Sequence, residues 1–99
     1  MIQAAVEETR PRCRLYLITP ASLTCDPVSL RSFRDILELA LDGGDVACVQ
    51  LRLKQVSDDD WQRAADILAP IVQSRDVAFI LNDRADLVVS TGADGVHIG

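Results

Sequence analysis

The sequence predicts an α/β fold in which parallel strands alternate with helices, and three observations point to it. Four short apolar runs rich in β-formers recur along the chain. The first two connecting segments carry apolar residues at helical spacing behind capping signals, and the third is short and closed by glycine. Strands and helices that alternate strictly imply parallel strands joined by right-handed crossovers.

The composition is that of one globular domain. The chain has 99 residues, of which 48% are hydrophobic, 4% aromatic and 25% charged. A net charge of −5 argues against nucleic acid or an anionic membrane surface as partner. No apolar run approaches the roughly 18 residues of a membrane helix. Residues 1–12 lack the apolar core of a secretory signal, so a cytoplasmic address is expected. We predict a flexible segment over 1–12 and a domain over 13–99.

The cysteines predict neither a metal site nor a disulfide framework. There are three, widely spaced, with no C-x-x-C pair and one histidine in the chain. A structural zinc site or a set of bridges needs more ligands at closer spacing. Cys48 lies in an apolar run, where we expect it to pack as a small hydrophobic residue.

The first strand and helix have clear boundaries. Residues 14–19 form an apolar run typical of a strand. Asp26 is a good N-cap, and Pro27 suits the first position of a helix that Gly43 and Gly44 end. The residues of its apolar stripe are Leu30, Phe33, Leu37, Ala40 and Leu41.

A second unit repeats this plan. Residues 47–54 predict a strand that alternates strictly after Val49. Ser57 and Asp60 have the spacing of a capping box at the start of a helix. Pro70 predicts a kink or an early end of that helix, because proline removes a backbone donor. The buried stripe of the helix is Trp61, Ala64, Ala65, Leu68, Ile71 and Val72.

The last part of the chain predicts two more strands. Residues 77–82 are the third strand, 85–91 form a short helix closed by Gly92, and 95–98 begin the fourth strand. No helix follows to cover the fourth strand, and two parallel edges would stay open. We therefore expect these residues to be part of a larger structure.

Cations on the second strand point to an anion site. Gln50, Arg52 and Lys54 point to one side of the predicted strand, because side chains alternate. Two cations on one face of a covered strand are costly without anionic partners. The carboxyl end of such a strand is where active sites form in barrels. A phosphate or pyrophosphate is the favoured ligand. The alternative is an amphipathic edge strand with a solvated face.

The third strand ends in Asn82 and Asp83. A carboxylate beside a polyphosphate suits Mg²⁺, which takes one or two carboxylates together with phosphate oxygens. Alternatively, Asp83 is the N-cap of the next helix, and position alone does not separate these interpretations.

Four other features of the sequence have a structural interpretation beside any functional one. Tyr16 either puts its hydroxyl into the barrel mouth or packs, and His97 is expected to be a hydrogen-bonded core residue. The dipeptide 75–76 and the acidic run 58–60 are expected to be solvated surface.

Four segments together resemble thiamine-phosphate synthase. They are 15–19 (LYLIT), 49–54 (VQLRLK), 80–87 (ILNDRADL) and 92–99 (GADGVHIG). The resemblance spans residues 14–99 and implies the N-terminal half of a (β/α)₈ TIM barrel. Members of this family join hydroxymethylpyrimidine pyrophosphate to hydroxyethylthiazole phosphate with Mg²⁺, giving thiamine phosphate and pyrophosphate.

The resemblance assigns roles to five residues. Gln50, Arg52 and Lys54 match the Q-x-R-x-K pattern that holds the substrate pyrophosphate. Asn82 matches a substrate-binding asparagine, and Asp83 matches the first Mg²⁺-binding aspartate. Arg52 and Lys54 would act catalytically by stabilising the leaving group as its charge develops.

The chain departs from the family in length. The glutamine and the second Mg²⁺-binding aspartate that follow in the family are missing, and a full barrel needs at least about 200 residues. We therefore expect a truncated form with an incomplete site. The alternatives are a thiazole tautomerase-type relative, or a non-catalytic half-barrel that pairs with another chain, including a second copy, through its open edges.

Overall fold

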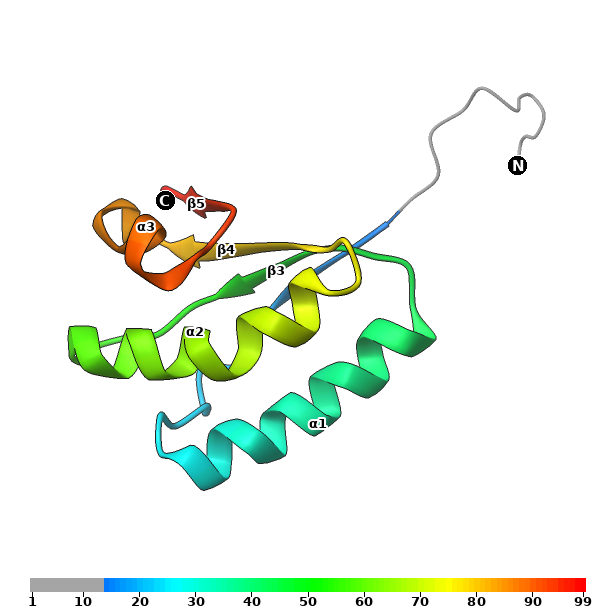
Figure 1. The fold of residues 1–99 in the computed structure, drawn as a ribbon, viewed down its shortest axis with the longest axis horizontal. Helices are drawn as coiled ribbons and strands as arrows, with labels where there is room; N and C mark the ends of the chain where they lie inside the picture. Colours follow the sequence, from blue (N-terminus) through cyan, green and yellow to red (C-terminus); the bar gives the residue numbers. More distant parts are fainter. Residues whose placement is uncertain (1–13) are drawn as a thin grey trace.

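The computed structural model describes residues 14–99, and the predicted flexible segment 1–12 lies outside them. Four strands form one parallel sheet in the order β2-β3-β4-β5 (Figure 1), which confirms the α/β prediction. The elements are β2 (Leu15–Ile18), α1 (Pro27–Gly43), β3 (Val46–Leu51), α2 (Asp58–Gln73), β4 (Ala78–Asn82), the 3₁₀ turn η1 (Ala85–Leu87), α3 (Val88–Thr91) and β5 (Gly95–His97).

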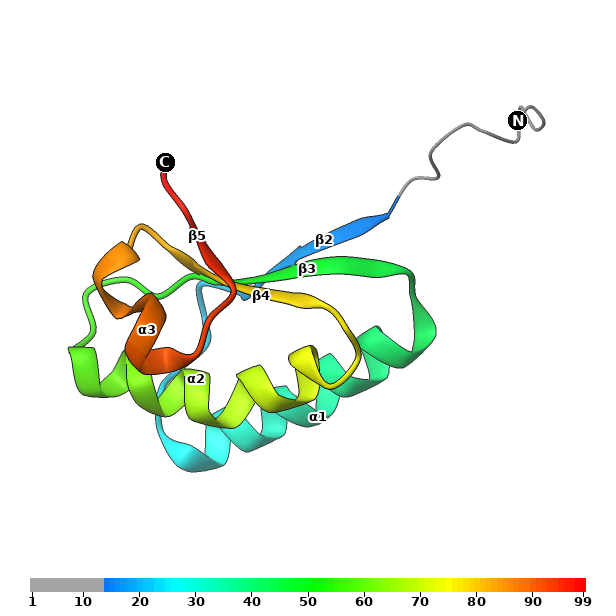
Figure 2. The same cartoon turned by 45° about the horizontal axis from the view of Figure 1, so that its top comes forward.

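The helices all lie on one face of the sheet. Figure 2 shows α1, α2 and α3 on the same side of the four strands, while no described helix covers the opposite face. A barrel is built this way, because its helices form the outer ring and the other face of the strands points inward. The described elements thus have the predicted arrangement of the N-terminal half of a (β/α)₈ barrel. Their open face corresponds to the barrel interior.

The hydrophobic core fills the space between the sheet and α1 and α2. The strands supply side chains that are at most 1% exposed: Val49, Leu51, Phe79 and Leu81. The helices supply, among others, Leu30, Leu37, Trp61, Leu68 and Val72. These residues belong to the stripes that the sequence predicts, so the periodicity identified the buried helix faces correctly.

Helix α1 begins at the predicted cap. The Asp26 carboxylate accepts a hydrogen bond from the Ser29 backbone N–H at 2.9 Å and another from the Thr24 hydroxyl at 2.8 Å. Pro27 occupies the first turn, where its missing N–H would have had no partner. The cap therefore fixes the start of α1 by local chemistry alone.

The cap makes stability depend on pH. The Ser29 backbone N–H, helped by the Thr24 hydroxyl, lowers the pKa of Asp26 from 3.8 to about 2. A carboxyl with a depressed pKa stabilises the fold above its unfolded pKa, and this contribution disappears as the pH falls through the folded pKa. We expect Asp26→Ala to lower the urea midpoint at pH 6 and to have a much smaller effect at pH 2. Equal losses at both pH values would contradict this account of the cap.

Helix α2 confirms one prediction and corrects another. The Ser57 hydroxyl accepts the Asp60 backbone N–H at 3.1 Å, as the capping signature requires. The early end at Pro70 is wrong, because α2 continues to Gln73. Pro70 is exposed and its carbonyl still accepts from the Ser74 N–H at 3.0 Å. In the last turn, proline removes one backbone hydrogen bond of the helix but does not end it.

The strand predicted over 47–54 is shorter at its carboxyl end. Pairing with β4 stops at Leu51 and Leu81, so Arg52 and Lys54 follow β3 rather than lie within it. The predicted helix over 85–91 is likewise divided into a 3₁₀ turn and a short α-helix. It ends at Gly92, whose φ of 73° suits glycine.

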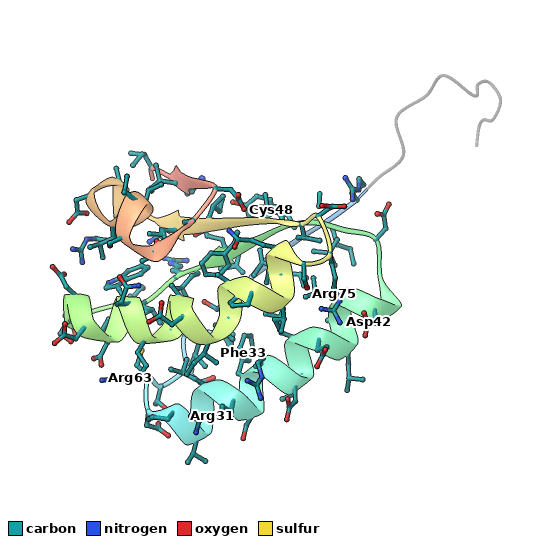
Figure 3. All side chains as sticks on the ribbon, viewed as in Figure 1. Arg31, Phe33, Asp42, Cys48, Arg63 and Arg75 are labelled. Carbon is teal, nitrogen blue, oxygen red and sulfur yellow. The ribbon has the colours of Figure 1, made fainter. Side chains whose placement is uncertain are left out.

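Arg75 is not the solvated residue that the sequence suggested. Its guanidinium contacts Asp42 at 2.8 Å and Glu38 at 3.1 Å, and donates to the Ile71 carbonyl at 2.8 Å. Figure 3 shows Arg75 beside Asp42 where the end of α2 meets α1. These contacts join the two helices.

No helix within residues 14–99 has the length and apolarity needed to span a membrane.

Candidate phosphate-binding site

The register of β3 and β4 brings the predicted site residues to one edge of the sheet. Gln50 pairs with Ile80 and Leu51 with Leu81, so Arg52 and Asn82 are the residues that follow the last pair, at the same carboxyl edge of the sheet. Leu51 and Leu81 face the helices and are buried. Because side chains alternate, Gln50 and Asn82 therefore lie on the open face.

Gln50 lies deepest in this arrangement. It is 4% exposed, and its amide nitrogen donates to the Tyr16 hydroxyl at 2.9 Å. Tyr16 thus turns its hydroxyl toward the open face and does not pack into the hydrophobic core. On the same face, burial raises the pKa of the Cys48 thiol, which keeps it protonated. Cys48 is half-buried and does not belong to the hydrophobic core or to the residues packed against it, so its expected role as a packed hydrophobic residue is not confirmed, and a protonated thiol is a poor nucleophile.

Arg52 and Lys54 supply the positive charge of the site. Both are exposed and line a cavity of about 130 Å³ with Thr19, Ala21, Leu23, Leu53 and Val56. Neither side chain forms an ion pair with a carboxylate within residues 14–99. The cavity therefore has two cations available for an anionic ligand.

Thr19 fixes the backbone at Arg52. Its buried hydroxyl accepts from the Arg52 N–H at 2.9 Å and donates to the Arg52 carbonyl at 3.3 Å. Its own N–H donates to the Gln50 carbonyl at 3.0 Å. A side chain at the end of β2 thus continues the pairing that the strand backbone no longer makes. Sequence reasoning did not single out Thr19.

Asp83 adopts an uncommon backbone conformation at the end of β4. Its φ is 61°, in the left-handed region that residues with a Cβ seldom occupy. The Asp83 N–H donates to the His97 carbonyl at 2.8 Å, and its Oδ1 accepts from the Gly99 N–H at 2.8 Å. The following 3₁₀ turn has Arg84 at its cap position, without a side-chain cap. The interpretation of Asp83 as an N-cap is wrong.

The Asp83 carboxylate is suited to bind a metal ion together with the phosphate oxygens of a ligand. Within residues 14–99, it accepts only from N–H groups, including Asn82 Nδ2 at 3.5 Å. No Arg or Lys of the described residues pairs with this carboxylate. The described residues contain no cluster of three or more His, Cys, Asp or Glu able to hold a metal. One carboxylate plus phosphate oxygens and water is a common Mg²⁺ arrangement, so Asp83 fits that role.

The predicted site residues share one edge of the sheet, but not all of them contact one another. No hydrogen bond or ion pair between described residues joins Arg52 or Lys54 to Asn82 or Asp83; their shared sheet edge brings them together. His97 is exposed, so its predicted core position is wrong. The acidic run is only partly solvated surface, because Asp58 pairs with Arg84 at 2.7 Å and Asp60 with Arg63 at 2.8 Å.

The comparisons with known proteins agree on one family. The family model of thiamine monophosphate synthase matches residues 15–99. The chain is 59% identical to a thiamine-phosphate synthase of Rhodospirillum centenum over 88% of its length and 40% of the relative's. It is 44% identical to a thiamine-phosphate synthase of Hyphomonas neptunium, over 93% of this chain and 42% of the relative. The chain thus spans about 40% of the length of these relatives.

A solved structure has the same arrangement of elements. It is the thiamine phosphate pyrophosphorylase from Pyrococcus furiosus, which superposes with a TM-score of 0.62 at 29% identity. The match covers 84% of this chain and 37% of that one.

Proposed function

The chain belongs to the thiamine monophosphate synthase family, and on this basis we propose that the carboxyl ends of β3 and β4 bind the pyrophosphate of hydroxymethylpyrimidine pyrophosphate. The reaction joins this substrate to hydroxyethylthiazole phosphate and yields thiamine phosphate and pyrophosphate. The chemistry proposed for the chain is that of a transferase acting on two small phosphorylated molecules.

The observation that carries the proposal is the pair of unneutralised cations. Arg52 and Lys54 line one cavity at the sheet edge where Asn82 and Asp83 end the neighbouring strand. Exposed cations without a carboxylate partner can form strong, charge-assisted hydrogen bonds to a phosphate. Their position around one cavity, rather than their exposure, favours a ligand site over the alternative of a solvated face.

The proposed step breaks the bond between the pyrimidine methylene carbon and the bridging oxygen of pyrophosphate. The bonding electrons leave with pyrophosphate, whose oxygens gain negative charge as the methylene becomes cationic. Arg52 and Lys54 would donate hydrogen bonds to these oxygens and lower the barrier, because the interactions strengthen with the developing charge. The thiazole nitrogen then forms the new bond to the methylene. The step needs no protein nucleophile.

Gln50, Asn82 and Asp83 would hold the reactants. The Gln50 side chain is fixed by Tyr16 in the open face, and Asn82 follows Leu81 at the same carboxyl edge of the sheet. Both amides can donate to a phosphate oxygen or to the pyrimidine. Asp83 would hold Mg²⁺, which when bound neutralises charge on the pyrophosphate.

Binding measurements on the purified chain test the proposal. We expect hydroxymethylpyrimidine pyrophosphate to bind in titration calorimetry, more tightly with Mg²⁺ than without, and inorganic pyrophosphate to compete. A synthase site requires this competition, whereas a thiazole tautomerase-type site does not bind pyrophosphate. Binding of the thiazole phosphate together with indifference to pyrophosphate would reject the synthase assignment.

A further inference from the structure

We propose that Arg84 is a positioning residue that ties the Asp83 loop to the start of α2 and so holds the Asp83 carboxylate in place. Its consequence for Mg²⁺ rests on the proposed function above, whereas its consequence for the geometry of the loop does not. The two are therefore measured separately.

Two of the three guanidinium nitrogens of Arg84, Nε and Nη2, donate hydrogen bonds to protein carboxylates. The guanidinium contacts Asp58 at 2.7 Å and Asp86 through two hydrogen bonds of 2.9 and 3.0 Å. It also lies over the ring of Trp61, 5.8 Å from the ring centre. These carboxylates raise the pKa of Arg84, which stays charged at every pH of interest. Because Nε and Nη2 are bound to two carboxylates, Arg84 is better suited to hold protein segments together than to bind a ligand.

The anchor beneath Arg84 is rigid. Trp61 is 3% exposed and belongs to the hydrophobic core, while Arg84 itself is 27% exposed at its side chain. A guanidinium stacked on a buried ring and bound to a carboxylate in a two-point contact has little freedom. This distinguishes Arg84 from Arg63, whose ion pair with Asp60 joins an exposed and a partly exposed residue of one helix.

Asp83 depends on such an anchor because its backbone is strained. A left-handed φ of 61° is retained only where the surroundings impose it. The Asp83 N–H and Oδ1 are held by the β5 side of the sheet, at His97 and Gly99. Arg84 is the next residue and holds the other side of the turn. The two sets of contacts together fix the direction of the carboxylate.

The ion pair also joins the two halves of the candidate site. Asp58 is the first residue of α2 and follows the segment 52–57, which carries Arg52 and Lys54. Arg84 follows Asp83 directly. The contact between Arg84 and Asp58 therefore bridges the loop with the cations to the loop with the carboxylate.

Asp58→Asn tests the bridge, with Asp59→Asn as its matched control. Both acids lie in the first turn of α2 and are exposed, and each substitution removes one negative charge from it. The Asp59 side chain has no hydrogen bond or ion pair with any residue within 14–99. Only Asp58→Asn removes the ion pair with Arg84 and reduces that contact to a weaker hydrogen bond between neutral and charged groups. It leaves Trp61 and Asp86 in place, so the chain keeps its core.

The first readout needs no ligand. In the metal-free chain, we expect Asp58→Asn to speed hydrogen exchange at the Asp83 and Gly99 amides about fivefold, because the loop opens more often. In Asp58→Asn, the core amides of β3 should exchange as in the unchanged protein. In Asp59→Asn, the Asp83 and Gly99 amides should also exchange at the unchanged rate. Unchanged exchange at Asp83 and Gly99 in Asp58→Asn would overturn the proposal.

The second readout connects the bridge to the site. Pyrophosphate titrations with Mg²⁺ should give about a tenfold weaker affinity for Asp58→Asn, by analogy with groups that orient metal ligands, and little change without Mg²⁺. If the unchanged chain binds no pyrophosphate, the proposed function fails, while the exchange rates still decide the role of Arg84. Equal affinities in the two variants would limit Arg84 to holding the loop and overturn its link to the metal.

Discussion

Replacing Arg52 with alanine is expected to weaken pyrophosphate binding by on the order of a hundredfold, because a hydrogen-bonded charge pair with the ligand is lost. Arg52 makes no ion pair within residues 14–99, so its removal leaves no carboxylate uncompensated there. Its backbone is held by Thr19 through main-chain atoms that alanine retains. The loss should therefore appear in binding and not in folding. Titration calorimetry measures the affinity, and thermal unfolding verifies the fold.

Arg31→Ala is the control for this substitution. Arg31 is an exposed residue of α1 whose side chain has no hydrogen bond or ion pair within the described residues (Figure 3). Its removal changes the net charge of the protein by the same amount. An equal loss of affinity in both variants would mean that the overall charge, and not the position of Arg52, attracts the anion. An unchanged affinity in Arg52→Ala would remove this residue from the site.

Leu68→Ala is expected to lower the free energy of unfolding by about 2–5 kcal/mol, since it removes a buried side chain and leaves a cavity. Leu68 is 0% exposed and lies in α2, in the core beneath the sheet. Chemical denaturation followed by circular dichroism measures the change. The substitution tests whether the described elements share one hydrophobic core that determines their stability.

Leu39→Ala provides the matched control. Leu39 is 74% exposed in α1, and its replacement makes the same change of helix propensity without opening a cavity. We expect a change within about 0.5 kcal/mol. A large loss in Leu39→Ala would show that something packs over this face of α1 in solution. A small loss in Leu68→Ala would mean that the core is looser than its burial indicates.

The helix starts could be predicted from the sequence because caps are local. Asp26 and Ser57 each bind a backbone N–H three residues ahead, so a short sequence pattern contains both partners. The helix end predicted at Pro70 is wrong because the effect of this proline is not set by local sequence alone. The proline removes one backbone hydrogen bond and crowds the carbonyl four residues earlier. Burial of Leu68, Ala69 and Val72 keeps the last turn of α2 in place, and that burial depends on packing rather than on a local sequence pattern.

The members of the candidate site were also predictable, although their geometry was not. Parallel strands place their carboxyl ends at one edge, so Gln50, Arg52 and Asn82 had to be close once the strands were identified. The four motifs led to the family, and the match over residues 15–99 confirms it. The metal role of Asp83 stays a prediction.

The contacts that shape the site join residues far apart in sequence. Tyr16 bonds to Gln50 and Thr19 to Arg52 across a helical crossover, and Arg84 reaches back to Asp58. No local pattern specifies such pairs, because they depend on how the sheet twists and where each loop turns. One signal was available: Arg84 directly follows the motif residue Asp83, and a cation beside a proposed metal ligand requires its own partners.

The measurement that tests the account most directly is a titration of the ¹⁵N-labelled chain with Mg²⁺ and pyrophosphate, followed by amide correlation spectra. The account predicts saturable shifts at residues 50–54 and 82–84, with the amides of α1 unchanged. Shifts confined to other surfaces, or spectra that stay unchanged throughout the titration, would contradict the claim that the ends of β3 and β4 form a pyrophosphate site.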